Sequence, residues 1–324
     1  MAHSLYIGID GGGTHSTAVA VLPDGSVTAL AYEDGLNFLN SGVETVRRRT
    51  ESMVTQLCQR AGVPVSEAMI CMGSSALDLP ADETTTRRFA KEVLSSEQLD
   101  LQSDAYAALM GCTLGEPGVI VICGTGSMLV LVDSKGNQLP AGGWGYLLGD
   151  AGSSYTLARE GLIAVIDAIE GIGASTALTA DALAFFDAKD RPRAIIDRVY
   201  APDFGPEKLA AFARFVLTRA NEGDPVAYDI VERNMKRLGR LAAQLLLRDE
   251  KARRIGLYGG VFRHNPFARE LFTETVLAQV PDAQFCPVVF PPELGAAIHL
   301  LRKDNLLSPK VLEQMKSTSK EIYP

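Results

Sequence analysis

The sequence predicts an α/β fold of two lobes, each with a mixed sheet flanked by helices. A unit of strand, glycine-rich turn, strand and second turn occurs twice in the chain. Each copy is followed by alternating helical and strand patterns. The 324 residues are enough for about two domains. Two such lobes would face their glycine turns across a cleft.

The first copy of the unit lies at the N-terminus. Residues 5–9 form an apolar strand, 10–15 a turn and 16–22 a second strand rich in β-forming residues. The tight turn at 23–25 leads into a third predicted strand, 26–32. The first lobe therefore begins with three consecutive strands.

The second copy repeats this order in the middle of the chain. Strands are predicted over 119–123 and 128–132, joined by the glycine turn 124–127 and followed by the turn 134–137. The turn-rich stretch just before this copy predicts a domain boundary, so that residues 1–117 form the first lobe and 118–324 the second.

Apolar spacing predicts the remaining elements. Between the copies it indicates helices over 43–61 and 84–93 and strands over 68–72 and 99–102. After the second copy the predicted elements are helices at 155–168, 209–220 and 225–247, a strand at 255–258, a helix at 266–279, a strand at 284–289 and a helix at 294–302. Residues 317–324 are polar and are expected to fray.

Composition and charge exclude several classes of protein. No apolar run approaches the roughly 18 residues of a membrane span, and a net charge of -8 disfavours nonspecific binding to nucleic acid. The five cysteines show no CxxC or Cys/His pairing that would hold zinc or an iron–sulfur cluster. The N-terminus lacks a signal-peptide pattern, so we expect a cytoplasmic protein that acts on a small molecule, without membrane or nucleic-acid partners.

The first glycine turn has the residues of a phosphate-binding loop. Gly11, Gly12 and Gly13 let the backbone approach a phosphate and donate amide hydrogens to it, and Thr14 can add a hydroxyl donor. Asp10 ends a buried strand, where an unpaired carboxylate is costly, and Mg²⁺, bound through water, is its natural partner. An ordinary turn that binds nothing is the alternative.

The second turn and the residue before the second lobe extend this site. Gly124, Thr125, Gly126 and Ser127 could be only a polar turn, and they indicate phosphate binding because they match the first unit. Asp104 lies where a strand passes into a helix and would point into the cleft. It either takes part in catalysis or only caps the helix.

Two further glycine-rich stretches follow. Residues 142–153 hold the only tryptophan, Trp144, and such a loop can lay backbone and an aromatic face against a sugar. The alternatives are that Trp144 is a core residue and that Asp150 caps the next helix. Gly259 and Gly260 follow an apolar strand, and their backbone could pass close to adenine or ribose or form a simple strand-to-helix turn.

With these motifs in this order, the sequence resembles the N-acetylglucosamine kinases, within the wider BadF/BadG sugar kinase and ATPase family of the actin/hexokinase superfamily. IGIDGGGTHS resembles the first phosphate motif, GTGS the second and LYGGVF the adenosine motif, while SDAYAAL and GGWGYLLGDAGS resemble the catalytic and sugar loops. The resemblance covers most of the chain. It implies two actin-like (ribonuclease H-like) lobes, each with a mixed five-stranded sheet, a nucleotide cleft between them, ATP and Mg²⁺ as cofactors, and a homodimer.

The resemblance also implies roles for single residues. Asp104 would be the general base for the 6-hydroxyl of an amino sugar, with N-acetylglucosamine as the first choice, as that hydroxyl attacks the γ-phosphoryl group of ATP. Asp10 would organise Mg²⁺, Thr14 and Thr125 would contact phosphates, and Gly260 the nucleoside. The residues that match sugar-binding positions are Asn37, Ser74, Asp104, Ser127, Trp144, Gly145 and Asp150.

Two departures from the family pattern leave the sugar open. Ala151 replaces the usual acid after the sugar-loop aspartate, and His264 stands near the nucleotide where relatives often carry a small polar residue. Glucosamine or another hexose is the alternative substrate. A second alternative is an ATPase that activates 2-hydroxyacyl-CoA dehydratases. Such an ATPase needs cysteines for an iron–sulfur cluster between subunits, and the cysteine pattern of this sequence argues against it. A non-catalytic sugar sensor or actin-like assembly protein is the third alternative, and the intact Asp104 argues against it.

Overall fold

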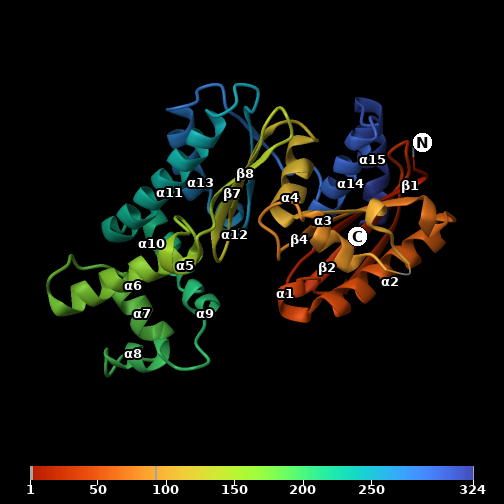
Figure 1. Ribbon diagram of the computed structural model, residues 1–324. Helices are drawn as coiled ribbons and strands as arrows, with labels where there is room; N and C mark the ends of the chain where they lie inside the picture. Colours follow the sequence, from red (N-terminus) through yellow and green to blue (C-terminus); the bar gives the residue numbers. More distant parts are fainter. Residues whose placement is uncertain (1–2, 92, 324) are drawn as a thin grey trace.

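The computed structural model describes residues 3–91 and 93–323, and its strands form two five-stranded sheets. The two sheets lie in separate lobes, each with helices on its faces (Figure 1). The predicted α/β fold with two mixed five-stranded sheets is therefore confirmed. Within the described residues, no helix combines the length and the apolar character needed to cross a membrane.

The first sheet has the strand order β3-β2-β1-β4-β5. Its strands are β1 (Leu5–Gly11), β2 (His15–Val21), β3 (Val27–Asp34), β4 (Ala68–Ser74) and β5 (Leu99–Ser103). β1, β2 and β3 pair antiparallel, whereas β1, β4 and β5 are parallel. The helices that follow these strands are α1 (Phe38–Ser41), α2 (Val43–Ala61), α3 (Glu83–Phe89) and α4 (Asp104–Thr113), with short 3₁₀ turns at Val65–Glu67 and Ser96–Gln98.

Alternation along β1 gives this sheet two apolar faces. Leu5 and Ile7 pack with Met53 and Leu57 of α2 on one face. Tyr6 points to the other face, where it packs with Leu294 and other residues of α14 (Pro292–Lys303). The sheet is therefore covered on both sides, as its parallel strands require.

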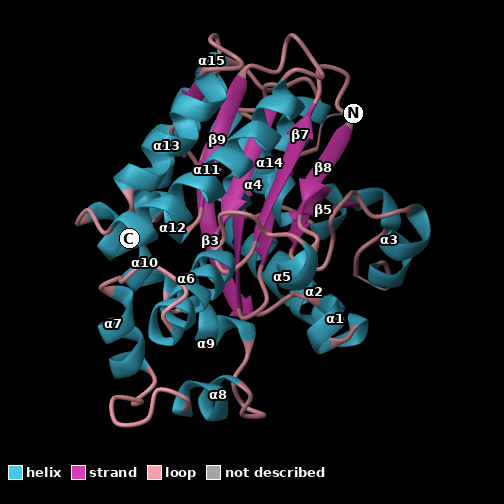
Figure 2. Ribbon diagram, turned by 90° about the vertical axis from the view of Figure 1, so that its left-hand side faces the viewer, coloured by secondary structure: helices cyan, strands magenta, loops and turns pink. Residues whose placement is uncertain are grey.

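The second sheet repeats the same topology, with the order β10-β9-β6-β7-β8. Its strands are β6 (Gly118–Cys123), β7 (Ser127–Val132), β8 (Gln138–Gly142), β9 (Arg254–Tyr258) and β10 (Gln284–Cys286). β6, β7 and β8 are antiparallel, and β6, β9 and β10 are parallel. Figure 2 looks onto this sheet, with α11 (Pro225–Leu246) and α13 (Pro266–Leu277) next to its strands.

The remaining helices belong mostly to the second lobe. They are α5 (Gly145–Leu148), α6 (Ser154–Glu170), α7 (Leu178–Phe185), α8 (Ala194–Val199), α9 (Pro206–Ala210), α10 (Ala213–Asn221), α12 (Gly260–His264) and α15 (Pro309–Ile322). The helix predicted over 209–220 is interrupted, because its residues are divided between α9 and α10. The predicted helix 84–93 ends at Phe89, Glu92 lies outside the described residues, and the strand predicted over 284–289 ends at Cys286.

Helices α4 and α14 cross closely between the two sheets. A side chain at Gly295 would bring its Cβ to 1.9 Å from the carbonyl oxygen of Ala107, so only glycine fits this crossing. α4 also packs on the second sheet, where Leu109 lies in one apolar cluster with Ile120 and Val130. The sequence between β5 and β6 thus forms a helix that is shared by both lobes.

The C-terminal segment returns to the first lobe, and the prediction that residues 317–324 fray is wrong for 317–323, while Pro324 lies outside the described residues. α15 buries Val311 and Met315 against the first sheet, and its Thr318 hydroxyl accepts a hydrogen bond from the amide of Val27 (2.9 Å). Figure 1 shows α14 and α15 beside β1. The division at residues 117 and 118 stays a prediction, although these last two helices pack with the first sheet.

Candidate active site

The predicted site residues follow the carboxyl ends of parallel strands. In the first sheet β1, β4 and β5 end at Gly11, Ser74 and Ser103. In the second, β6 and β9 end at Cys123 and Tyr258. Carboxyl ends of parallel strands share one edge of a sheet, which is where open α/β proteins bind ligands. The topology therefore gathers the predicted residues at one edge of each sheet.

The first glycine turn joins β1 to β2 and is fixed from behind. The carbonyl oxygen of Gly12 accepts a hydrogen bond from the amide of Leu36 (2.9 Å). A Cβ at Gly35 would lie 2.2 Å from the carbonyl oxygen of Gly13, so this close approach requires glycine. Gly13 and Thr14 remain exposed at the tip of the turn.

The second glycine turn is fixed by the start of α6. The amides of Ser154 and Tyr155 donate to the carbonyl oxygens of Gly124 (2.8 Å) and Thr125 (3.2 Å). A hydrogen bond from the Gly124 amide to the Gly126 carbonyl oxygen (2.9 Å) closes the turn. Thr125 is exposed at its tip. The two glycine turns are therefore similarly exposed at their tips. They differ in the segments that hold them, which are residues 35 and 36 for the first turn and the start of α6 for the second.

Ser103, and not Asp104, caps α4. The Ser103 hydroxyl oxygen accepts a hydrogen bond from the amide of Tyr106 (3.1 Å), as an N-cap does. Asp104 is the first residue of the helix, and among the described residues its Oδ1 accepts from the neighbouring amide of Ala105 (2.6 Å). Ser103 therefore fills the capping role that was the alternative for Asp104. The second carboxylate oxygen of Asp104 remains available for other contacts.

Asp10 lies between the first turns of α4 and α14. Gly8 and Asp10 point to the same face of β1 because side chains alternate along a strand. A Cβ at Gly8 would lie 1.9 Å from the carbonyl oxygen of Glu293, the second residue of α14. Asp10 pairs with Gly73 of β4, whose Cβ would lie 3.3 Å from Cα of Asp104. Three acidic residues therefore share this face of the sheet.

All three acids have raised pKa values, and that of Asp10 is raised in part by the other two. Burial raises the pKa of Asp10 to about 7, with added repulsion from Glu293 and Asp104. Burial also raises the pKa of Glu293, which is 5% exposed, against the opposing hydrogen bond from the Tyr323 hydroxyl (2.7 Å). The pKa of Asp104 is raised by burial and by Asp78. A cation at this position would relieve the repulsion.

The residues fit a hydrated Mg²⁺ ion. Carboxylate oxygens are the protein ligands that Mg²⁺ prefers, and it usually keeps waters and phosphate oxygens in its remaining positions. No group of three or more His, Cys, Asp or Glu side chains in the described part of the chain could hold a metal by itself. The donor set thus fits Mg²⁺ bound through water and nucleotide. Glu293 was not predicted, and its signal is an acid within the apolar run 292–298.

The structure gives the glycine-rich loop an exposed aromatic residue. Trp144 precedes α5 and is 74% exposed, so the alternative that it is a core residue is wrong. Leu147 and Leu148 of α5 are also exposed. A large apolar surface at a loop beside the predicted site is typical of a ligand contact.

Asp150 connects this loop to the second glycine turn. It is 8% exposed, and its Oδ1 has no hydrogen-bond partner among the described residues. A Cβ at Gly126 would lie 2.9 Å from Oδ2, and Ser127 donates to the carbonyl oxygen of Ala151 (2.8 Å). Burial raises the pKa of Asp150, because the backbone amides around it compensate only in part.

Ser153, rather than Asp150, caps α6. Its hydroxyl oxygen accepts a hydrogen bond from the amide of Thr156 (3.2 Å). The alternative that Asp150 is the cap is therefore wrong. A buried carboxylate without this structural use is a candidate ligand contact.

Asn37 and Ser74 lie at the same edge of the first sheet. Asn37 caps α1 through its Oδ1, which accepts from the amide of Leu39 (3.0 Å), and its Nδ2 donates to the hydroxyl of Ser75 (3.2 Å). Ser74 is fully buried at the end of β4, with its hydroxyl oxygen accepting from the amide of Ala76 (3.3 Å). A sugar contact for either residue stays a prediction.

The predicted nucleoside residues meet the end of β6. Gly259 has φ 106°, and a Cβ there would lie 2.2 Å from the carbonyl oxygen of Cys123, so the position requires glycine. Gly260 begins α12, which is exposed at this point. His264 ends α12 and lines a separate hollow of about 230 Å³ with Asn221 of α10. The structure thus brings the two glycines, but not the imidazole, directly to the strand ends.

Residues 7–298 match the model of the BadF/BadG/BcrA/BcrD ATPase family. The chain belongs to this family. Residues 309–322 of α15 lie beyond the matched range.

Relatives of known name cover most of the chain. An N-acetyl-D-glucosamine kinase from Dictyostelium discoideum is 27% identical over 323 residues, covering 92% of this chain and 98% of that protein. An N-acetylmuramic acid/N-acetylglucosamine kinase from Clostridium acetobutylicum is 24% identical and covers 90% of this chain and 96% of its own. A solved structure from Chromobacterium violaceum, described as a candidate N-acetylglucosamine kinase, has a TM-score of 0.69 at 25% identity and covers 93% and 100% of the two chains. The predicted resemblance is confirmed.

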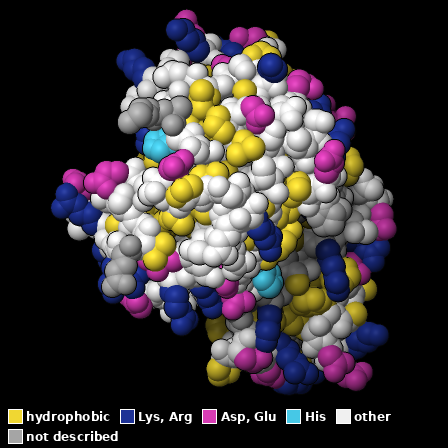
Figure 3. Space-filling model, turned by 90° about the vertical axis from the view of Figure 1, so that its right-hand side faces the viewer, with side chains coloured by type: hydrophobic (Ala, Val, Ile, Leu, Met, Phe, Trp, Pro, Cys, Tyr) yellow, Lys and Arg dark blue, Asp and Glu magenta, His cyan; other side chains and the backbone are white. Residues whose placement is uncertain are grey.

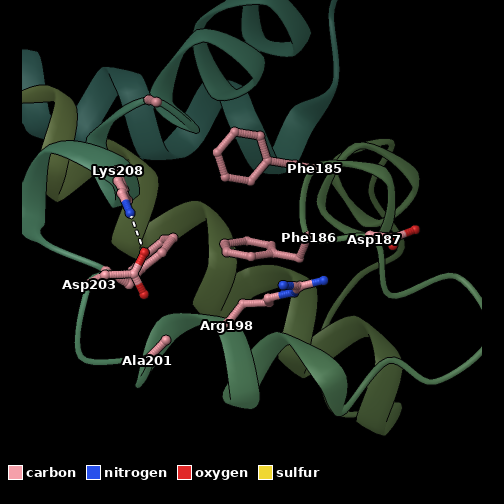
Figure 4. A pocket seen from close by; sticks show the side chains of 9 residues that line it. Phe185, Phe186, Asp187, Arg198, Ala201, Asp203 and Lys208 are labelled. Carbon is pink, nitrogen blue, oxygen red and sulfur yellow. Dashed lines mark hydrogen bonds and ion pairs between the residues drawn. The ribbon is translucent and has the colours of Figure 1, made fainter.

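This protein has a further hollow away from the predicted site residues. It has a volume of about 440 Å³ and lies among α7, α8 and α9, with none of the predicted site residues in its lining. Figure 4 shows the rings of Phe185 and Phe186 beside it, Arg198 next to Phe186, and the ion pair between Lys208 and Asp203 (2.6 Å). This hollow therefore belongs to the helical part of the second lobe and not to the candidate site.

Proposed function

We propose that the protein is an ATP-dependent kinase that transfers the γ-phosphoryl group to the 6-hydroxyl of an amino sugar, with N-acetylglucosamine as the first choice. The observation that carries the proposal is the position of Asp104. Its carboxylate follows a parallel strand, lies next to Asp10, and is not used as the helix cap. The names of the curated relatives support the same chemistry.

Asp104 acts as the general base. Its raised pKa makes the carboxylate a stronger base than an exposed aspartate, which favours proton transfer from an alcohol near neutral pH. Proton removal from the 6-hydroxyl accompanies its attack on the γ-phosphorus. Since little covalent chemistry falls to the protein in this reaction, positioning of the two substrates contributes most of the catalysis.

The nucleotide is held by both glycine turns. The backbone and hydroxyl groups that contact the phosphates are those of Gly11, Gly12, Gly13, Thr14, Gly124, Thr125 and Gly126. Gly259 and Gly260 contact the nucleoside, and a contact from His264 would require the nucleoside to reach the separate hollow that its imidazole lines. Asp10, together with Glu293, would hold a hydrated Mg²⁺ ion. The ion, when bound with ATP, neutralises charge on the phosphate oxygens.

The sugar is held by residues of both lobes. From the first lobe these are Asn37, Ser74 and the base itself. From the second they are Ser127, Trp144, Gly145 and Asp150. The exposed face of Trp144 suits stacking against a sugar ring, and the buried Oδ1 of Asp150, unpaired among the described residues, suits a sugar hydroxyl.

We also propose a cytoplasmic location and a homodimer. Glucosamine or another hexose remains the alternative acceptor.

The direct test is the Asp104→Asn variant. We expect sugar-dependent ADP release to fall by about 10²- to 10⁴-fold, because the amide cannot accept the proton. Binding of N-acetylglucosamine, measured by calorimetry, should be retained. A panel of N-acetylglucosamine, glucosamine and glucose identifies the acceptor in the same assay.

The matched control is Asp190→Asn, which removes an exposed acid of the second lobe. It should leave turnover unchanged. Full turnover by Asp104→Asn would refute the assignment of the base, and ADP release that does not depend on any sugar would refute the kinase proposal itself.

A further inference from the structure

Helix α6 exposes apolar side chains on the face that it does not bury. Its buried face, which includes Leu157 and Val165, packs in the core of the second lobe. Four isoleucines at the opposite face and at the end of the helix are 41% to 77% exposed: Ile163, Ile166, Ile169 and Ile172. α6 lies on the side of the second lobe away from the first sheet (Figure 1). Contiguous apolar surface of this kind marks a contact with another molecule.

The centre of the exposed face is a stripe of four residues. Arg159, Ile163, Ile166 and Glu170 are separated by four, three and four positions, so they follow one line along the helix. We call these four residues the α6 stripe. The same spacing occurs along the seam of two packed helices. The stripe has an apolar pair at its centre and an opposite charge at each end.

The charges at the two ends are not neutralised within the chain. Arg159 and Glu170 are both exposed. Neither forms an ion pair within residues 3–91 and 93–323, whereas the neighbouring acid Glu160 binds Arg233 of α11 (2.8 Å). One free cation and one free anion therefore flank the two isoleucines.

The α6 stripe is complementary to itself. The midpoint between Arg159 and Glu170 is also the midpoint between Ile163 and Ile166. Each charged residue lies about 8 Å from this point along the helix axis, at 1.5 Å per residue. Two copies of α6 that pair antiparallel about a two-fold axis at the midpoint bring Arg159 opposite the partner's Glu170, and Ile163 against the partner's Ile166. The two-fold symmetry makes each of these contacts twice.

We infer that the α6 stripe is the surface that binds a second copy of this chain. The inference rests on the homodimer proposed above, which it deepens by naming the contact, and it does not depend on the kinase chemistry. A different protein would not require a stripe that matches its own reverse. A contact limited to one helix from each copy is smaller than the roughly 800 Å² per partner of a standard interface, so we expect a dissociation constant of about 1 to 100 μM.

The experiment is sedimentation velocity of the full-length protein between about 1 and 200 μM, which spans the expected dissociation constant. The parent protein is compared with Arg159→Glu, with Glu170→Arg and with the double variant that carries both changes. Each single change places like charges opposite each other at both ends of the paired stripes. The double variant restores opposite charges with their positions exchanged.

We expect the parent protein to dimerise, and its dimer to weaken with added salt. Each single charge variant should raise the dissociation constant by at least about tenfold, and the double variant should return it to within about threefold of the parent value. Ile166→Asp should also dissociate the dimer, because it places two carboxylates at the apolar centre. Circular dichroism verifies that each variant is folded.

The controls change matched residues on α8. Arg193→Glu reverses an exposed arginine, and Ile196→Asp replaces an isoleucine that is 45% exposed. Both variants should dimerise like the parent protein. A dissociation constant that rises equally in the controls would mean that the α6 stripe has no special part in dimerisation.

Three results would overturn the inference. They are a parent protein that stays monomeric at every concentration, a dimer that the single charge variants leave unchanged, and a double variant that dissociates as readily as the single ones. Sugar-dependent ADP release is measured on the same samples. Its absence in a dimeric parent protein would refute the kinase proposal and not this surface.

Discussion

At the scale of single residues, Asp10 has the most unfavourable surroundings in the candidate site. Its pKa is raised from 3.8 to about 7, first by burial and then by repulsion from Glu293 and Asp104. The folded protein therefore holds this proton over a range in which the unfolded chain has lost it. The contribution of Asp10 to the free energy of unfolding is fully present below pH 3.8, and it is lost as the pH rises toward 7.

We predict that Asp10→Asn stabilises the nucleotide-free protein at pH 8. The amide carries no charge, so it avoids the loss that the carboxylate suffers. The stability advantage over the parent protein should grow by about 2 kcal/mol between pH 5 and pH 8, measured by urea unfolding. Asp190→Asn should show no such change. A variant that is less stable than the parent protein at pH 8 would contradict this description of the acidic cluster.

The residue scale is also where prediction from the sequence was least complete. Asp10, Asp104 and the glycine turns could be predicted because each follows an apolar strand directly. Glu293 could not, because only the packing of α14 on β1 places it near Asp10, 283 positions earlier in the chain.

At the scale of elements, the C-terminal helix departs most from expectation. Its sequence looks polar, yet Val311 and Met315 are four positions apart on one face and are buried against the first sheet. Ser308 caps it, with its hydroxyl accepting from the amide of Val311 (3.4 Å). The polar residues counted as a frayed end are the solvent side of an amphipathic helix.

We predict that Met315→Ala destabilises the protein by about 2 to 5 kcal/mol, because its fully buried side chain would leave a cavity. Chemical unfolding measures the change. Lys316→Ala, at the next and exposed position of the same helix, should stay within about 0.5 kcal/mol of the parent protein. Equal stability of the two variants would mean that α15 does not pack as described.

At the scale of the whole molecule, one topology is used twice. Both sheets have three antiparallel strands followed by two parallel ones, and each begins with a hairpin whose turn is rich in glycine. This repetition could be predicted because the two units resemble each other in sequence. The return of α14 and α15 to the first sheet could not, since it depends on contacts between distant segments.

A group of polar side chains connects the two sheets. Gln138 of β8 donates to Oε1 of Gln102 on β5 (2.8 Å), and Gln102 in turn donates to Asp100 (2.5 Å). His299 and Lys303 of α14 complete this group through Asp100 (3.0 and 2.8 Å).

On the face shown in Figure 3, acidic and basic side chains are interspersed over the surface.

The central claim is that both glycine turns hold one nucleotide while Asp104 activates the sugar. A crystal structure with a non-hydrolysable ATP analogue, Mg²⁺ and N-acetylglucosamine tests it most directly. We predict phosphates in contact with residues 12–14 and 124–126 at once, and the 6-hydroxyl about 2.6 to 3.2 Å from the Asp104 carboxylate. A nucleotide held by one lobe alone, or a sugar hydroxyl out of reach of Asp104, would contradict the account.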